Sequence, residues 1–167
     1  MKSIRIVVAA CALILLVAAS ASAQQAVFVV RHAERADAGM NTPAADPALS
    51  AAGKARAARL ATMLRSSGIR SIFTTEFVRT RQTAAPTAQA FHLQVVAIPS
   101  NDPAAVVTQA KAAPGNVLIV GHSNTVPDVL KRLGIKEAIT IAEAEFDNLF
   151  VVVRPESGEP TLIRLRY

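Results

Sequence analysis

The chain has 167 residues, with 18 Lys and Arg against 12 Asp and Glu, and a formal net charge of +6. This length is typical of one domain. There is one tyrosine and no tryptophan. With neither a basic run nor an aromatic surface for bases to stack on, the sequence argues against a nucleic-acid-binding protein.

Residues 1–23 have the pattern of a secretory signal peptide. Lys2 and Arg5 precede an apolar stretch at 6–18, and the tripeptide Ala-Ser-Ala at 21–23 fits an A-x-A cleavage site. The apolar stretch is shorter than the ~20 residues that span a bilayer, so we expect no stable membrane anchor after cleavage. The prediction is a domain over 24–167 in the periplasm or secreted. Cys11 is the only cysteine, so the mature domain would lack disulfides.

Apolar runs alternate with helical patterns through the rest of the chain. Strands are expected at 27–30, 69–74, 93–98, 117–120, 149–153 and 161–165. Helices are expected at 50–67, 75–91, 103–111 and 125–134. This order predicts an α/β three-layer sandwich with a mostly parallel central sheet and helices on both faces. The last two strands form a hairpin that adds an antiparallel C-terminal edge.

Particular residues mark where these helices begin and end. Ser50 is a good N-cap for the first helix, and Gly68 ends it. Thr75 is expected to cap the second helix, and Pro86 to kink or divide it. Thr125, with an acid three residues on, approximates a capping box for the fourth.

Two histidines follow predicted strands, which is where open α/β sheets bind ligands. His32 follows the strand at 27–30 and Arg31, and His122 follows the strand at 117–120 and Gly121. A neutral imidazole is a competent nucleophile towards phosphorus, although the sequence does not indicate which nitrogen attacks. An isolated histidine that only hydrogen-bonds within its loop is the alternative. The repetition of the arrangement favours a functional pair.

Arginines near these junctions offer planar donors suited to phosphate oxygens. Arg31 is the first candidate. Arg79 is the second, because it falls in the first turn of a helix counted from Thr75, whereas Arg81 faces elsewhere. Glu34 and Arg35 are interpreted as a possible ion pair without a catalytic role.

Ser123 and Asn124 precede the helix at Thr125. Backbone amides and the positive end of the helix dipole at this point favour a bound phosphate. Plain helix capping is an equally good interpretation of these two side chains, and the sequence leaves both open.

Metal and nucleotide chemistry find no support in the sequence. No two histidines have i, i+4 spacing, and no carboxylates have ligand spacing. There is neither a Walker-type loop nor a G-x-G-x-x-G, so no cofactor is expected. Ser123 is not in a G-x-S-x-G elbow, which argues against a serine hydrolase.

Four segments together resemble the histidine phosphatase superfamily, the phosphoglycerate-mutase-like proteins, over nearly all of the predicted mature chain. The segment RHAE at 31–34 resembles R-H-G-E, with alanine for glycine, and LSAAG at 49–53 resembles L-[ST]-x-x-G. TEFVRTRQTA at 75–84 resembles S-x-x-x-R-[AT]-x-Q-T-A, and GHS at 121–123 resembles the family's G-H. The resemblance implies that His32 is phosphorylated, and that Arg31, Arg79 and His122 complete the phosphate pocket.

One departure from the family concerns the proton donor. Many members carry a glutamate general acid in a segment after the third strand, whereas Asp102 is the only acid in the short segment here at 99–103. Asp102 is therefore the candidate donor. The compact chain argues against mutase activity. The expectation is a metal-independent phosphatase acting on a small phosphorylated substrate. A non-catalytic phospho-ligand-binding module and an exported phosphoprotein phosphatase remain alternatives, and the oligomeric state stays open.

Overall fold

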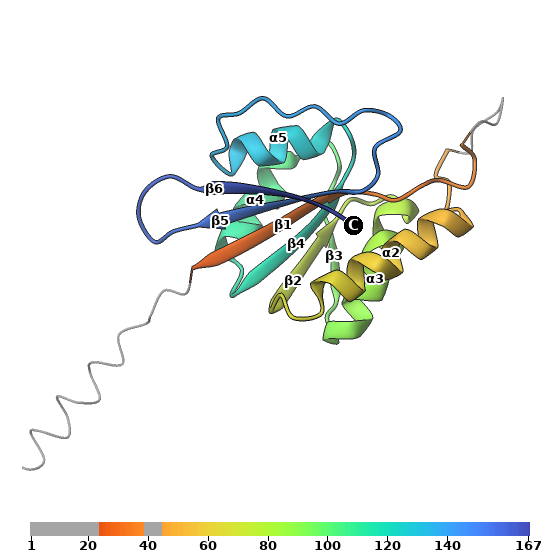
Figure 1. Cartoon of the computed structure of the whole chain (residues 1–167), viewed down its shortest axis with the longest axis horizontal. Coiled ribbons are helices and arrows are strands. Elements are labelled where there is room, and N and C mark those ends of the chain that lie inside the picture. Colours follow the sequence, from red (N-terminus) through yellow and green to blue (C-terminus); the bar gives the residue numbers. More distant parts are fainter. Residues whose placement is uncertain (1–23, 39–44) are drawn as a thin grey trace, which may run out of the picture.

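The computed structural model describes residues 24–38 and 45–167 (Figure 1). The predicted signal peptide lies outside these ranges. Within them, no helix has both the length and the apolar character needed to cross a membrane.

One six-stranded sheet, in the order β3-β2-β4-β1-β5-β6, forms the centre of the fold. Its strands are β1 (Gln25–Arg31), β2 (Ile69–Thr74), β3 (Val95–Ala97), β4 (Asn116–Gly121), β5 (Asn148–Arg154) and β6 (Thr161–Arg166). The first four are mutually parallel, β5 is antiparallel to β1, and β6 is antiparallel to β5. The predicted mixed sheet with an antiparallel C-terminal edge is confirmed.

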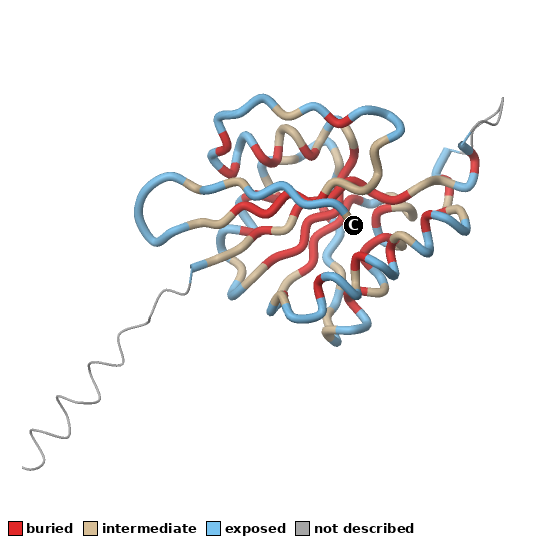
Figure 2. Tube along the Cα trace, in the orientation of Figure 1, coloured by how far each residue is buried: buried red, intermediate tan, exposed pale blue. Residues whose placement is uncertain are grey.

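Helices cover both faces of this sheet. Helices α2 (Ala51–Leu64) and α3 (Val78–Phe91) pack together on one face, and α4 (Pro103–Ala112) and α5 (Thr125–Arg132) on the other (Figure 1). Two separate apolar clusters result, because strand side chains alternate between the faces. Leu60 and Leu64 pack against the first face, and Val126 and Leu130 against the second. Figure 2 shows the buried chain concentrated in the central strands between these layers.

Three local expectations were wrong. Thr75 does not cap α3, which begins at Val78; the Val78 amide instead donates to the carboxylate of Asp46, at 2.9 and 3.1 Å. Pro86 does not divide α3, because packing against α2 and β2 holds one continuous helix. Thr125 forms no capping box: its hydroxyl accepts from the His122 amide at 2.9 Å.

The register of the sheet brings the two histidine junctions together. Arg31 lies opposite Gly121 in the parallel β1–β4 pair, so His32 and His122 leave the sheet side by side. Thr74 lies opposite Val120 in the neighbouring pair, which places the turn after β2 beside His122. The carboxyl ends of three parallel strands therefore meet at one edge.

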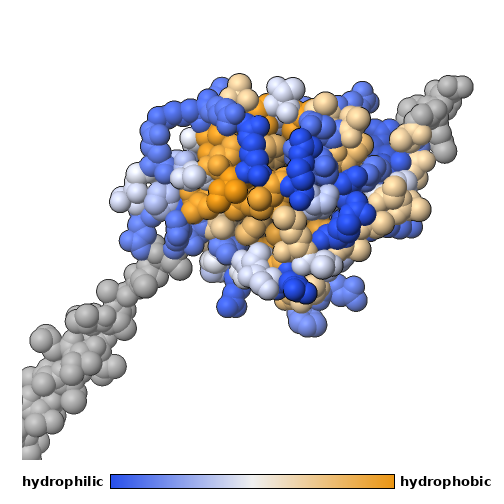
Figure 3. Space-filling model, in the orientation of Figure 1, coloured by the Kyte–Doolittle hydropathy of each residue, from blue (hydrophilic) through white to orange (hydrophobic). Residues whose placement is uncertain are grey.

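Part of the surface remains apolar. Figure 3 shows an orange area on the face where β5 and β6 lie in front, crossed by polar side chains. Ile163 and Leu165 of β6 are 45% and 41% exposed. This area is separate from the edge where the histidines lie.

Candidate active site

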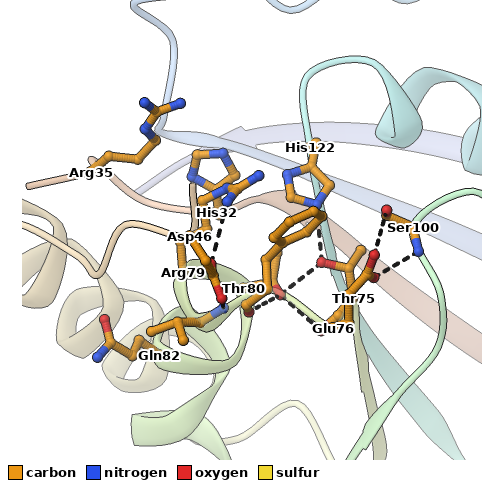
Figure 4. Close-up of polar contacts among 12 residues, drawn as sticks. His32, Arg35, Asp46, Thr75, Glu76, Arg79, Thr80, Gln82, Ser100 and His122 are labelled. Carbon is orange, nitrogen blue, oxygen red and sulfur yellow. Dashed lines mark hydrogen bonds and ion pairs between the residues drawn. The ribbon is translucent and has the colours of Figure 1, made fainter. Parts of the chain in front are cut away.

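A cavity of about 430 Å³ opens at the carboxyl ends of β1 and β4. Its polar and charged lining residues are Arg31, His32, Arg35, Arg79, Ser100, His122, Ser123, Asn124, Thr125 and Glu143, and Phe77 and Ile141 add apolar surface. Three of the four motif segments line the cavity: RHAE at 31–34, TEFVRTRQTA at 75–84 and GHS at 121–123. The fourth, LSAAG at 49–53, does not. Figure 4 shows the two histidines next to each other, with Arg79 close by.

His32 is held in one tautomer. Its backbone amide donates to the carbonyl of Gly121 at 2.8 Å, and its Nδ1 lies 2.8 Å from the carbonyl oxygen of Ala33. Since a carbonyl only accepts, Nδ1 carries the proton and Nε2 keeps its lone pair. The pKa of His32 is lowered to about 3. Burial is the main cause, the Ala33 carbonyl opposes it, and the charges of His122, Arg79 and Arg31 contribute to the decrease. The imidazole is therefore neutral at physiological pH.

His122 lies edge-on to His32, with ring centroids 5.2 Å apart. Its Nε2 is 3.0 Å from Oγ1 of Thr75, which in turn lies 2.9 Å from Oγ1 of Thr80 (Figure 4). The pKa of His122 is lowered to about 4, mainly by burial and then by the charge of Arg79, while Glu76 opposes the change. A chain of hydroxyl groups thus fixes the second imidazole from behind.

Arg31 is anchored by backbone oxygens rather than by a carboxylate. Its Nη1 donates to the carbonyls of Ala142, Glu143 and Glu145 at 3.0, 2.8 and 3.1 Å, and its guanidinium lies 4.1 Å from the ring centroid of Phe146. Nε of Arg31 is buried without a hydrogen-bond partner. The positive charge is therefore held in place without being directly neutralised.

Arg79 lies in the first turn of α3. Its guanidinium stacks 4.2 Å from the ring centroid of Phe77, and Nη1 is 3.6 Å from the carboxylate of Asp46. Nε has no hydrogen-bond partner here either. Burial is the main cause that lowers the pKa of Arg79, followed by the charge of Arg35, while Asp46 opposes them.

Other residues of the sequence motifs hold the loop around His32. Oγ1 of Thr83 accepts from the Ala33 amide at 3.0 Å, and Oε1 of Gln82 accepts from the Leu49 amide at 2.7 Å. A Cβ on Gly53 would lie 2.2 Å from the carbonyl oxygen of Glu34, so only glycine lets α2 approach so closely. These residues support the cavity from outside.

The sequence-level match agrees with this geometry. A family model described as histidine phosphatase superfamily (branch 1) matches residues 27–100. Residues 27–100, which include His32 and Arg79, are therefore similar to the histidine phosphatase superfamily. No curated protein matches the chain.

Several solved structures share the fold of this chain. A protein histidine phosphatase SixA complexed with tungstate has a TM-score of 0.67 at 20% identity, covering 84% of this chain and 96% of its own. An alpha-ribazole phosphatase from Shigella flexneri has a TM-score of 0.68 at 17% identity, covering 85% and 96%. A phosphoserine phosphatase from Entamoeba histolytica, with 3-phosphoglyceric acid, has a TM-score of 0.65 at 12% identity, covering 86% and 97%.

Asp102 is not brought to the cavity. It is the N-cap of α4, and its Oδ1 accepts from the Ala105 amide at 2.9 Å. Ser123 and Asn124 do line the cavity, and Asn124 makes no side-chain cap. Arg81 is exposed, as its helix position predicted.

Two parts of the site were missed in the sequence. Arg35 lines the cavity, although it was given no role; its guanidinium binds Asp37 with two contacts of 2.8 and 2.9 Å rather than Glu34, which binds Arg56. The segment between α5 and β5 supplies Ile141 and Glu143. Its acids and apolar residues have no period or motif that would have marked them.

Proposed function

We propose that this protein is a metal-independent phosphatase that hydrolyses phosphomonoesters through a phosphohistidine formed on Nε2 of His32. One observation carries the proposal: the contact between Nδ1 of His32 and the Ala33 carbonyl leaves Nε2 unprotonated inside a cationic cavity. A nucleophile held in one tautomer needs no reorganisation before it attacks.

The reaction follows from the groups that line the cavity. Nε2 of His32 bonds to phosphorus while the ester P–O bond breaks, and the alcohol leaves. Water then attacks phosphorus, the P–N bond breaks, and phosphate is released. Arg31, Arg79 and His122 stabilise the charge on the non-bridging oxygens in both steps.

The unpartnered guanidinium atoms support an anionic ligand. Nε of Arg31 and Nε of Arg79 are both buried without a partner among the described residues. Buried donors of this kind are costly unless an acceptor satisfies them. Phosphoryl oxygens are suitable acceptors, and the two guanidiniums supply the positive charge that phosphoryl transfer requires. In the described ranges no group of three or more His, Cys, Asp or Glu is placed to hold a metal ion.

The substrate that we propose is a small phosphorylated molecule. A cavity of about 430 Å³ is within the size range of small-molecule sites. The structural neighbours are named for different substrates, so the fold leaves the ester open. A phosphoprotein substrate and a binding module without turnover are the competing outcomes of the experiment below.

The experiment compares wild type, His32→Ala and His92→Ala on 4-nitrophenyl phosphate in EDTA. His92 is exposed at the end of α3 and is the matched control. We expect turnover by wild type and the control but not by His32→Ala, with an acid-labile phosphoenzyme trapped only when His32 is present. Equal rates in all three would contradict the proposal. Stoichiometric phospho-ligand binding without phosphate release would indicate the binding module, and a preference for phosphopeptides the protein phosphatase.

We further propose that the domain over 24–167 acts outside the cytoplasm. The support is the charged, apolar and Ala-Ser-Ala pattern at 1–23, which lies outside the described residues. Expression of the full chain in a Gram-negative host, followed by N-terminal sequencing of the periplasmic and medium fractions, tests it. A product beginning at Gln24 is expected, and a full-length product confined to the cytoplasm would contradict it.

A further inference from the structure

Release of an alkyl alcohol from phosphorus requires a proton donor, because an alkoxide is a poor leaving group. The groups described so far do not provide one. Both imidazoles are neutral at physiological pH, since burial lowers the pKa of His32 to about 3 and of His122 to about 4. Guanidiniums do not release protons in this range. If the proposed function holds, a further acid must act on the leaving oxygen.

Two acids near this edge of the sheet are engaged elsewhere. Asp102 caps α4 and does not line the cavity. The Glu76 carboxylate uses one oxygen for the Ser100 amide at 2.8 Å and the other for the Ser100 hydroxyl at 2.9 Å, and it does not line the cavity either (Figure 4). Both carboxylates position the segment between β3 and α4.

Glu143 is different, because it is the one carboxylate residue among the described residues that line the cavity. It belongs to the segment between α5 and β5, and its own carbonyl accepts from Arg31 at 2.8 Å. The carbonyls of Ala142 and Glu145 bind the same nitrogen, so the backbone on both sides of Glu143 is fixed to the residue that precedes the nucleophile. Ile141 is buried and anchors the segment to the core.

Glu143 interacts electrostatically with two arginines that line the cavity, Arg31 and Arg35. Among the charged neighbours of Arg31, Glu143 has the strongest effect on its pKa, which it raises against the dominant effect of burial. Arg35 also interacts with Glu143, although Asp37 affects its pKa more. Arg31, Arg35 and Glu143 line the same cavity, so Glu143 shares the cavity in which we expect the arginines to bind the ligand. A glutamate that only neutralises the arginines would lie in the same place, so the experiment must distinguish a counter-ion from a general acid.

We propose that the Glu143 carboxyl group protonates the leaving oxygen of the ester. In the first step Nε2 of His32 bonds to phosphorus, the P–O bond breaks, and its electron pair takes the proton from Glu143. In the second step a water oxygen bonds to phosphorus, the electron pair of the P–N bond returns to Nε2, the water proton passes to solvent, and solvent reprotonates Glu143. The glutamate is thus regenerated, and the general acid comes from a different element than in many relatives.

The test uses two substrates with different leaving groups. 4-Nitrophenolate leaves without assistance, whereas the alkoxide of glycerol 2-phosphate does not. We expect Glu143→Gln to lower kcat for glycerol 2-phosphate by about 100-fold or more, as loss of a general acid does, and to change kcat for 4-nitrophenyl phosphate by less than about threefold. Glu145→Gln is the matched control, because Glu145 shares the segment but pairs with Arg166 at 3.0 Å.

Each outcome of this comparison supports or contradicts a general-acid role for Glu143. Equal losses on both substrates, or a change in KM alone, would show that Glu143 is a counter-ion and would overturn the proposal, as would an unchanged rate on glycerol 2-phosphate. A selective loss in Asp102→Asn or Glu76→Gln instead would move the role to that residue. If wild type hydrolysed neither substrate, the proposed function itself would fail before Glu143 was tested.

Discussion

Nη1 of Arg79 lies 3.6 Å from the carboxylate of Asp46, and the same carboxylate accepts from the Val78 amide at the start of α3. One acid from the segment before α2 therefore replaces the missing side-chain cap of α3 and contacts a phosphate-binding guanidinium. The ion pair is long, and the Asp46 side chain is 38% exposed, so it holds Arg79 only weakly.

Two substitutions, Asp46→Asn and Asp46→Ala, separate the capping of α3 from the ion pair with Arg79. Asparagine retains an oxygen for the Val78 amide but loses the charge, whereas alanine loses both. We expect Asp46→Ala to lower the free energy of unfolding by about 1 kcal/mol, as loss of an N-cap does, and Asp46→Asn to lower it by less than half of that. Because Asp46 competes with the anion for Arg79, Asp46→Asn should bind inorganic phosphate about twofold more tightly. Weaker binding in calorimetry would show that the ion pair positions Arg79 instead.

Arg79 and Arg81 provide a matched comparison within one helix. Arg79 lines the cavity, whereas Arg81 is exposed on the other side. We expect Arg79→Ala to lower kcat/KM on 4-nitrophenyl phosphate by about 100-fold or more, because a preorganised donor to the transition state is lost. Arg81→Ala should stay within about twofold of wild type. Comparable losses in both variants would contradict the assigned phosphate pocket.

The two buried histidines should make folding stability depend on pH. In the unfolded chain each imidazole takes up a proton near its ordinary pKa of 6.5, whereas in the folded chain the pKa of His32 is about 3 and that of His122 about 4. The unfolded state therefore binds more protons as the pH falls below 6.5, and stability falls with it. The slope should approach about 1.4 kcal/mol per pH unit for each histidine.

Urea unfolding between pH 4.5 and 6 checks this expectation. His32→Asn should remove about half of the slope. The ¹⁵N spectrum of wild type should show Nδ1 of His32 protonated and Nε2 bare at pH 7, as the Ala33 contact requires. An imidazolium signal for His32 at pH 6 would contradict the neutral nucleophile.

The sheet and most of the cavity could be predicted because their signals are local. Apolar runs of four or more residues marked β1, β4 and β5, and shorter apolar patterns marked β2 and β6. His32 and His122, just after β1 and β4, meet because these strands are parallel and in register. Helix spacing favoured Arg79 over Arg81, and the family resemblance strengthened that choice. These inferences need only the periodicity of the chain and the rule that ligands bind at the carboxyl ends of parallel strands.

The features that the sequence did not predict depend on contacts between segments that are far apart in the chain. Asp46 replaces Thr75 as the cap of α3, and the loop carbonyls around Glu143 hold Arg31, yet neither pairing leaves a mark in the nearby sequence. Asp102 was chosen by its position relative to a family segment, whereas its structure follows the ordinary preference of aspartate for an N-cap. The N-cap preference of aspartate therefore predicts the structure around Asp102 better than its position relative to the family segment does.

Gly53 should not tolerate a side chain, although alanine normally favours a helix by about 1 kcal/mol. A Cβ there would overlap the backbone carbonyl of Glu34, at 2.2 Å, so α2 or the loop around His32 must shift. We expect Gly53→Ala to lower the free energy of unfolding by about 1–3 kcal/mol and to reduce kcat. Ala55→Gly, on the exposed side of α2, should cost about 1 kcal/mol without loss of activity. A stabilised, fully active Gly53→Ala would contradict the close approach.

The hydroxyl of Thr75 should position His122 without touching the substrate. Thr80 can donate to Oγ1 of Thr75, at 2.9 Å, which leaves the Thr75 hydroxyl to donate to Nε2 of His122, at 3.0 Å. Nδ1 of His122 then carries the proton and is the donor available to a phosphoryl oxygen. Thr75→Val keeps the shape but removes the hydroxyl, so we expect kcat to fall about tenfold, with the ¹⁵N spectrum showing a mixture of His122 tautomers. Thr75→Ser should restore both the rate and the single tautomer. Loss of activity in Thr75→Val with an unchanged tautomer would show that the threonine acts through packing alone.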